Sequence, residues 1–400
     1  MSQSKSKSKR VLEPAPLRAA EGTPSAAGST LPAGRGRPAL RVGMFNRRPS
    51  LQHGGVEHVV RAVTHELAAQ RPDWEIIPVA AFSHAGGVES INGVSDLVAT
   101  VVLAWRLLRG RFDVVFVHCP ECMSVMQLLR RFVLRQVRLV AVWHGAGPLP
   151  YLVLRSPGDP LARALAWFRC SEERRALPAD AHIAVHASVA RDLRRYYGFT
   201  DAVTVVENAI EPDMLRKLQQ ASPARGADCY TVLWVGQADH RKGLDVALEA
   251  CRIARATVPQ LRLVVVGLPP RQGPDWVVWR GVLDPTEVHT PYRDADVFLF
   301  PSRYESFGLV VVEAMAAGLP VVVSDAVPAG IVQAGRNGVV IAGHRPEEYA
   351  TALVDLWRAR DARARMSEAN RGDAGRFSWP VAAQRYAAVA LQVTEGGSRA

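Results

Sequence analysis

The chain has 400 residues, of which 48% are hydrophobic, 22% charged and 7% aromatic, and this size and composition predict a soluble protein of two ordinary domains. The formal net charge is +11, but residues 1–38 hold seven bases and two acids, so nearly half of the excess belongs to one terminal segment and gives little support to nucleic-acid binding. The apolar run at 97–105 has nine residues where a membrane-spanning helix needs ~20, and no apolar signal core follows the first lysines, so we expect a cytoplasmic protein.

The first half of the chain alternates between strand and helix patterns. Residues 1–38 are rich in Ser, Lys, Ala, Gly and Pro and are expected to be a disordered basic tail. From Leu40 onward, short β-branched runs alternate with helical periodicity, which predicts a parallel sheet covered on both faces in a domain over 39–210. We expect strands at 40–45, 75–80, 113–117, 138–143, 182–185 and 203–206, and helices at 56–69, 94–108 and 122–135.

A second alternation follows a segment of mixed charge. Residues 211–228 contain Pro212, Pro223 and Gly226 and are interpreted as a linker. Beyond it we expect a second doubly wound domain over 229–376, so that the carboxyl ends of two parallel sheets border a ligand-binding cleft. Its expected strands are 230–235, 261–267, 276–279, 296–300 and 320–324, and its expected helices are 243–256 and 309–317.

The stretch from Phe298 to Pro320 carries the strongest chemical signal. An apolar strand leads into a loop with Glu305, a helix begins near Gly308, and a second carboxylate, Glu313, follows inside that helix. A helix that begins at a strand-end loop directs unpaired N–H groups and a positive dipole toward the cleft, where phosphate oxygens bind well. Ionised carboxylates accept hydrogen bonds from sugar or ribose hydroxyls. The stretch therefore predicts an anion site with carboxylates nearby that can bind hydroxyl groups.

This stretch resembles the Glu-x7-Glu signature of the retaining glycosyltransferases of family four, which have the GT-B fold of two Rossmann-like domains. A second segment, 235–245, resembles the strand, loop and Arg-Lys-Gly element of that family. The resemblance implies that Arg241 and Lys242 hold the donor diphosphate, and adjacent cations at such a junction can neutralise a leaving diphosphate. Many members carry Arg directly after the first Gly of this element, where this chain has Gln237.

The same resemblance, which covers about residues 40–392, implies roles for further residues. His144, at the end of the strand 138–143, would lie beside the transferred sugar, and Asn208 would be structural. The segment from Phe377 onward is similar to the family's last helix, so 377–400 is expected to be a crossover helix and tail. The donor-binding residues implied in this way are Gly54, Gly55, Gly236, Arg280, Gly281, Val282, Ser306, Phe307, Gly308, Leu309, Val310 and Glu313.

The activity that the resemblance implies is transfer of a sugar from a nucleotide-sugar donor with retention of configuration. The catalytic residues would be Glu305, Lys242, Arg241 and His144, with Glu305 holding sugar hydroxyls and Glu313 the ribose. A donor phosphate oxygen would take the acceptor's proton on the same face. The sequence also leaves open a nucleophilic role for Glu305.

We expect neither a tightly bound cofactor nor a required metal. Asp294 and Asp296 have the spacing of a metal-binding pair, but Asp296 leads directly into a strand. Cys119 and Cys122 have zinc spacing without a second pair nearby. The five cysteines are scattered and odd in number, which argues against a disulfide framework and for a reducing compartment.

The acceptor is less well defined by sequence. Glu121 follows a strand end in the first domain and could contact the acceptor. Seven arginines and two acids lie between Leu103 and Arg138, interleaved with apolar residues. Such helices suit an anionic membrane surface and a lipid-linked or envelope glycan acceptor, or are simply solvated faces.

The sequence also bears on other classes of protein. A nicotinamide dehydrogenase needs a Gly-x-Gly-x-x-Gly turn after its first strand, which Gly54 and Gly55 do not supply. A nucleotide-sugar epimerase or a phosphorylase on the same fold, or a transferase acting on a small soluble acceptor, remains the alternative. A silent scaffold is disfavoured because both carboxylates and both cations are present.

Overall fold

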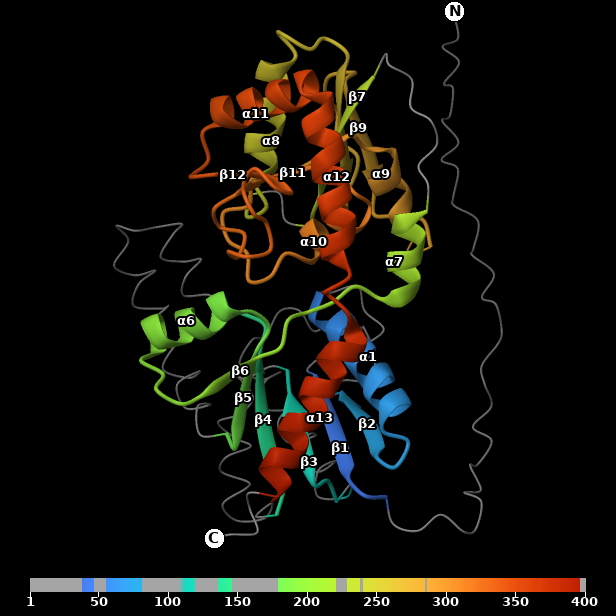
Figure 1. The fold of residues 1–400 in the computed structure, drawn as a ribbon, viewed down its shortest axis with the longest axis vertical. Helices are drawn as coiled ribbons and strands as arrows, with labels where there is room; N and C mark the ends of the chain where they lie inside the picture. The colour runs from blue at the N-terminus through green and yellow to red at the C-terminus, as the bar shows by residue number, and fades with distance from the viewer. Residues whose placement is uncertain are drawn as a thin grey trace, which may run out of the picture. The chain divides into compact units, whose positions relative to one another are not determined.

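Two parallel sheets organise the protein, each with six strands in the part of the chain that the structure describes (Figure 1). This computed structural model describes residues 38–46, 55–80, 109, 111–118, 136–145, 179–220, 229–237, 240–284 and 286–395. The helices expected at 94–108 and 122–135 and the basic tail lie outside these residues. The described residues fall in one compact unit that begins at Pro38.

The first sheet has the strand order β2-β1-β3-β4-β5-β6, with every neighbouring pair parallel. Its central strands are almost wholly apolar and buried, as expected for a parallel sheet with helices on both faces. The strands are β1 (Arg41–Asn46), β2 (Glu75–Ala80), β3 (Val114–Val117), β4 (Arg138–Trp143), β5 (Ala181–Ala184) and β6 (Val203–Val205).

The second sheet has the order β12-β11-β10-β7-β8-β9 and is also parallel throughout. From β7 the chain adds β8 and β9 on one side of the sheet and then β10 to β12 on the other, so the strand order reverses between β7 and β10. Open α/β sheets bind ligands at the carboxyl ends of the strands beside such a reversal. The strands are β7 (Tyr230–Val235), β8 (Leu261–Val266), β9 (Val277–Gly281), β10 (Val297–Phe300), β11 (Val321–Ser324) and β12 (Gly338–Ile341). The sequence did not predict β12.

Helices cover both faces of the second sheet because alternate strand residues point to opposite sides. Val232 and Trp234 pack under α8 (Leu244–Ala254) and α11 (Pro346–Arg358). Leu233 and Val235 belong to the core on the other side, which α9 (His289–Asp294) and α10 (Leu309–Ala316) help to cover. The first sheet is covered by α1 (Gly55–Gln70) and α6 (Ala187–Tyr197), with α13 (Trp379–Glu395) beside α1.

Carboxylates at strand starts hold neighbouring strands in register. Asp296 accepts a hydrogen bond at 2.8 Å from the backbone N–H of Thr231. Asp113 accepts one from Arg41 N–H at 2.7 Å, and Asp180 accepts one from Leu139 N–H at 2.8 Å. Each carboxylate accepts a hydrogen bond from a backbone N–H group that has no partner in the neighbouring strand. This contact gives Asp296 a structural role.

The segment expected to be a linker contains a helix, α7 (Pro212–Gln219). Pro212 was interpreted as a breaker, but proline suits the first helical position because its missing N–H has no partner to lose there. Met214, Leu215 and Leu218 lie at helical spacing and pack into the core. The helix contacts α9 and α10 of the second sheet.

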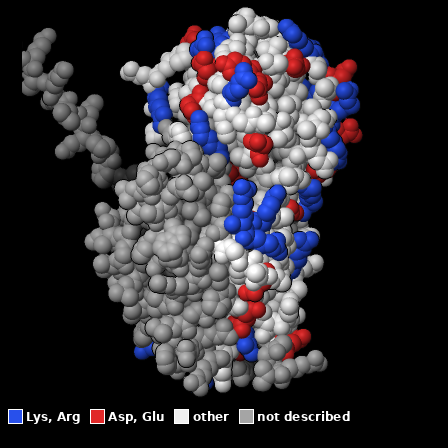
Figure 2. Space-filling view, turned by 90° about the vertical axis from the view of Figure 1, so that its left-hand side faces the viewer, with Lys and Arg blue, Asp and Glu red and all other residues white. Residues whose placement is uncertain are grey.

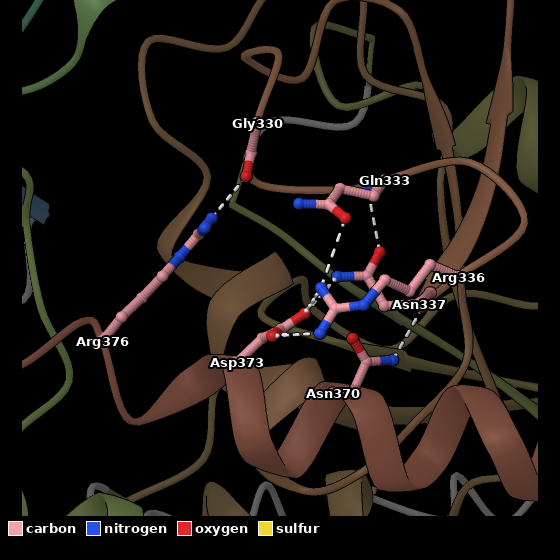
Figure 3. Close-up of polar contacts among 7 residues, drawn as sticks. All are labelled: Gly330, Gln333, Arg336, Asn337, Asn370, Asp373 and Arg376. Atoms are coloured by element: carbon pink, nitrogen blue, oxygen red, sulfur yellow. Dashed lines mark hydrogen bonds and ion pairs between the residues drawn. The ribbon is translucent and has the colours of Figure 1, made fainter.

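A polar network fastens the loop after β11 to α12 (Arg360–Ala374), neither of which the sequence predicted as an element (Figure 3). Asp373 accepts two hydrogen bonds from Arg336, at 2.7 and 2.9 Å, and one from Asn337 at 3.1 Å. The buried amide of Asn370 donates to the backbone oxygens of Leu319 and Asn337, at 2.7 and 2.8 Å. This loop is therefore held at several points.

The chain then crosses back to the first sheet in α13, which packs against α1, β3 and β4 (Figure 1). Beside the crossing, Ile210 and Ser378 form a parallel bridge, and Ile210 N–H donates to Phe377 O at 3.2 Å. The two segments that join the sheets thus run side by side. This architecture confirms the predicted GT-B fold with its crossover helix. Among the described helices, none has the length and apolarity to cross a membrane.

Candidate functional site

The loops that follow β7 and β10 bring a cation and a carboxylate into contact at the strand reversal of the second sheet. Lys242 Nζ donates to Glu305 Oε2, and the two side chains are only 13% and 8% exposed. Burial lowers the pKa of Lys242, Glu305 raises it, and nearby Arg241 lowers it again. The two residues of this pair lie 63 positions apart in the sequence. Lys242 and Arg241 together carry two positive charges against the one negative charge of Glu305, so this group of three is positive overall.

Other contacts hold the two loops together. Arg303 binds both carboxylate oxygens of Asp245, at 2.6 and 2.8 Å, and its backbone N–H donates to Arg241 O at 2.8 Å. The Ser302 hydroxyl donates to Tyr304 O at 3.0 Å, and the Ser324 hydroxyl donates to Ser302 O at 2.5 Å. Glu305 is therefore carried on a loop with little freedom to move.

Glycines let the strand ends approach one another. Gly243 has φ of 69°, and a Cβ there would lie 1.9 Å from Pro301 O. A Cβ on Gly267, with φ of 95°, would lie 2.6 Å from Gly236 O. Gly236 is itself close to Lys242, whose Cγ would be 3.2 Å from an added Cβ. Only glycine meets both the conformation and the space at 243 and 267.

Gly308 is the N-cap of helix α10 and has φ of 93°. A Cβ on Gly308 would lie 3.3 Å from the Glu305 Cγ, so the helix start is next to the ion pair. Leu309 and Val310 occupy the first turn, where backbone N–H groups have no intrahelical acceptor. Their N–H groups and the dipole favour an anion here.

Phe307 has a packing role. Its side chain is 2% exposed, and its ring lies 5.7 Å from that of Phe377 and 6.3 Å from that of His186. Only its backbone could reach a ligand. Ser306, in contrast, is partly exposed, and its side chain would lie 3.7 Å from a Cβ on Gly145, directly after His144. The loop of Glu305 therefore approaches the end of β4.

Glu313 is held by a tyrosine that the sequence reading missed. Tyr292, fully buried on α9, donates its hydroxyl to Glu313 Oε2 at 2.6 Å. Burial raises the pKa of Glu313 to about 7, while the tyrosine hydrogen bond lowers it. Glu313 lies four residues after Leu309, so it shares a helix face with the first turn of α10.

Replacing Tyr292 by Phe is expected to shift the pH dependence of donor binding upward. Without the hydroxyl, the pKa of Glu313 rises further above its present value of about 7, by about one pH unit for a hydrogen bond to a charged group. In the role that the resemblance implies, ionised Glu313 accepts hydrogen bonds from the donor ribose, so donor KM should increase as the pH falls and Glu313 becomes protonated. In the variant this increase should begin at a higher pH than in the parent protein. Steady-state kinetics from pH 6 to 9 measure this; a pH profile of KM that does not move contradicts the role given to Tyr292.

At the carboxyl edge of the first sheet, two histidines meet. His118 follows β3 and His144 follows β4, and His118 Nδ1 lies 2.9 Å from His144 Nε2. Burial lowers the pKa of His144 to about 4 and that of His118 well below its usual value. Gly145 packs closely against Tyr304, because a Cβ added to Gly145 would lie 3.4 Å from the Tyr304 hydroxyl. His144 thus lies near the loop that carries Glu305.

The residues expected to contact the base lie at the end of β9. Gly281 has φ of 72°, and its carbonyl accepts a hydrogen bond from Gly267 N–H at 2.7 Å. Arg280 is exposed, and Val282 is 67% exposed. The ends of β7, β8 and β9 thus form one glycine-lined edge that reaches from Gly236 to the base segment.

Some predicted residues lie outside the described part of the chain. These are Gly54, Glu121 and the two close cysteines Cys119 and Cys122. Gly55 is the first residue of α1. Of the arginines between 103 and 138, the structure describes Arg109, Arg111 and Arg138. Among the described residues, no group of three His, Cys, Asp or Glu side chains is placed to hold a metal.

The described surface carries a further set of bases. Helix α6 exposes Arg191, Arg194 and Arg195. On the face turned toward the viewer in Figure 2, Lys and Arg side chains gather near mid-height, with Asp and Glu above and below. A localised positive surface is typical of proteins that meet anionic partners.

The sequence reading missed His118, Tyr292 and the Arg303–Asp245 clamp. One signal was present for His118: it directly follows a predicted strand, as His144 does, so both belong to the same sheet edge. Tyr292 carries no comparable signal, because its partner Glu313 is 21 residues away on another helix.

Two family models match the chain. The model described as Glycosyl transferases group 1 matches residues 216–373, and the one described as Glycosyltransferase Family 4 matches residues 53–214. A D-inositol 3-phosphate glycosyltransferase of Thermobispora bispora is 31% identical over 317 residues, which cover 72% of each chain. A phosphatidyl-myo-inositol mannosyltransferase of Propionibacterium freudenreichii is 31% identical over 303 residues, which cover 74% of each chain.

Solved structures share the fold at lower identity. Sucrose-phosphate synthase from Thermosynechococcus elongatus aligns with a TM-score of 0.75 and 20% identity over 89% of this chain and 100% of that chain. Anabaena HepE in complex with UDP-glucose aligns with a TM-score of 0.64 and 17% identity over 88% of this chain and 99% of that chain.

Proposed function

The chain belongs to glycosyltransferase family 4 and is a GT-B glycosyltransferase, and from this premise we propose that it transfers a sugar from a nucleotide-sugar donor to an acceptor hydroxyl with retention of configuration. The observation that carries this proposal is the buried Lys242–Glu305 pair beside the start of α10. A cation, a carboxylate and a helix N-terminus lie together there, which suits a sugar joined to a diphosphate.

In this proposal the cations bind the diphosphate of the donor and the carboxylates bind its hydroxyl groups. Lys242, Arg241 and the first turn of α10 stabilise the negative charge that develops on the departing diphosphate. Glu305 orients the sugar hydroxyls. Glu313, held by its hydrogen bond from Tyr292, accepts hydrogen bonds from the ribose hydroxyls. A phosphate oxygen of the donor removes the proton from the attacking acceptor hydroxyl, so that the new bond forms on the face that the diphosphate leaves.

The donor is identified by a thermal-shift panel. UDP-, GDP- and ADP-sugars are each added to the full chain, and the one that binds the folded protein best raises Tm most. HepE was solved with UDP-glucose, which makes UDP-sugars the first to test. If no nucleotide sugar shifts Tm at millimolar concentration, the proposed donor site is wrong.

The acceptor proposed first is a phosphorylated inositol. Both relatives named above act, by their names, on molecules that contain inositol. The panel contains D-inositol 3-phosphate, phosphatidylinositol in vesicles and unphosphorylated inositol, with the best donor held constant. Transfer to the lipid places the enzyme in glycolipid or envelope glycan synthesis, whereas transfer to the free phosphate makes the acceptor small and soluble.

Product analysis separates transfer from the alternative reactions on this fold. A transferase yields a glycosylated acceptor and nucleoside diphosphate, and NMR of the new anomeric centre shows whether configuration is retained. An epimerase instead yields free nucleotide with an altered sugar and does not depend on an acceptor. We also propose that the protein's own cations replace a metal, so that EDTA leaves the transfer rate unchanged.

Membrane association is a separate proposal with its own test. The exposed arginines of α6 and those between 103 and 138 support binding to an anionic surface. Flotation with phosphatidylglycerol vesicles, compared with neutral phosphatidylcholine vesicles, measures it. Equal recovery with both lipids removes this part of the proposal.

A further inference from the structure

The two histidines at the carboxyl edge of the first sheet lie in contact, and one of them is buried. His118 is 3% exposed, and its ring lies 6.2 Å from that of Tyr386 on the crossover helix, at an interplanar angle of 11°. Its Nδ1 is 2.9 Å from His144 Nε2. Among the described residues, its other nitrogen, Nε2, is buried without a hydrogen-bond partner.

This geometry allows two arrangements of the proton between the neutral rings. If His144 Nε2 donates, His118 must carry its own proton on Nε2, where a buried N–H would have no acceptor. If His118 Nδ1 donates, only a lone pair is left unpartnered on Nε2. Orphaned buried N–H groups are rarer than unsatisfied acceptors in folded proteins, so the second arrangement is favoured. Burial, which lowers the pKa of both rings, keeps them neutral.

The consequence for His144 concerns its second nitrogen. Its Nε2 is occupied as an acceptor, so its proton must sit on Nδ1. Among the described residues, no hydrogen bond engages Nδ1, and His144 is partly exposed next to the loop of Tyr304 and Glu305. The open nitrogen therefore presents an N–H and no lone pair.

We infer that His118 is a positioning residue that holds His144 in the tautomer with the proton on Nδ1, so that His144 serves as a hydrogen-bond donor to the bound sugar and does not act as a general base. The part that concerns the sugar rests on the proposed function. The tautomer itself depends only on the contacts within this chain.

The tautomer is measured on the full chain labelled with ¹⁵N-histidine. Long-range ¹H–¹⁵N correlation spectra at neutral pH distinguish protonated from unprotonated ring nitrogens, and the His144 signals are identified by their loss in His144→Gln. We expect a protonated Nδ1 and an unprotonated Nε2. A protonated Nε2 on His144 overturns the inference whether or not the enzyme turns over any donor tested.

A near-isosteric pair of variants tests the effect on transfer. His118→Asn keeps an N–H donor close to the position of Nδ1, whereas His118→Leu fills similar volume without one. We expect kcat of the Leu variant to be about tenfold below that of the Asn variant, the size of one net hydrogen bond, with similar donor KM. His144 in the Leu variant should show mixed tautomers.

If the role of His118 were purely structural, the Leu and Asn variants would rank differently in Tm and kcat. An apolar Leu should then stabilise the buried position at least as well as Asn, and Tm and kcat should follow each other. Equal kcat in the two variants contradicts the inference. If either variant does not fold, the spectrum of the parent protein still decides the tautomer. If no donor reacts but the tautomer is as expected, the proposed function fails and the inference about His118 stands.

Discussion

Replacement of Lys242 by Met is expected to lower kcat between about a hundredfold and a thousandfold, the usual loss when one group that stabilises transition-state charge is removed. Met has similar length and no charge, so the variant removes the cation and little volume. Donor KM should change less, because the charge on the diphosphate grows mainly as the sugar bond breaks. Single-turnover and steady-state rates with the identified donor measure both effects.

The same substitution leaves Glu305 buried without its partner. Breaking a buried ion pair on one side is strongly destabilising, and for this pair, which is 13% and 8% exposed, about 3 kcal/mol is expected. The double variant K242M/E305Q removes both charges and should recover most of the stability while staying inactive. That combination separates a catalytic loss from a folding loss.

Arg252→Ala is the matched control for charge. Arg252 lies on α8, ten residues after Lys242, is 63% exposed and, among the described residues, forms its ion pair with Glu249 on the same helix. Exposed pairs of this kind are screened by solvent and contribute little to stability, so activity and Tm should stay near those of the parent. If Lys242→Met is as active as Arg252→Ala, the diphosphate role of Lys242 is wrong.

Replacement of Gly243 by Ala is expected to lower the free energy of unfolding by about 3 kcal/mol, from a left-handed backbone and an overpacked contact together. The new Cβ would be placed 1.9 Å from Pro301 O, so the loop that carries Glu305 must move. We therefore expect loss of activity at temperatures where the variant is still folded. Urea unfolding followed by tryptophan fluorescence, with parallel activity assays, measures the two effects.

Gly198→Ala isolates the backbone part of this cost. Gly198 has φ of 64°, close to the 69° of Gly243, but a Cβ there meets nothing within 4 Å. It should cost about 1 kcal/mol and leave activity unchanged. Equal losses of stability at the two positions would show that the Pro301 contact does not matter.

Much of the fold was accessible from local pattern. Strand and helix alternation predicted the strands from β1 to β11 within one or two residues at their ends, and the resemblance predicted the crossover helix. Local pattern misleads where one residue suits two structures: Pro212 is typical of a linker, but it also suits the first position of a helix and begins α7. Helix α12 was not predicted, and only a few of its residues are buried, so its apolar periodicity is weak.

For the site, too, some features follow from the sequence and others from the tertiary structure. The sequence by itself determined which residues occur at strand ends and helix starts, because burial periodicity and glycine positions are local properties. Local pattern therefore placed Glu305 and Glu313 at a helix start and His144 at a strand end, whereas the roles of Lys242 and His144 came from the family resemblance.

Only the tertiary structure decided which of these residues touch. Lys242 meets Glu305 because β7 and β10 are neighbours in the sheet although β8 and β9 lie between them in sequence. His118 meets His144 because β3 pairs with β4, and Tyr292 reaches Glu313 because α9 and α10 share a face of the second sheet. Strand order and helix packing follow from burial of the whole chain, and no local pattern encodes them.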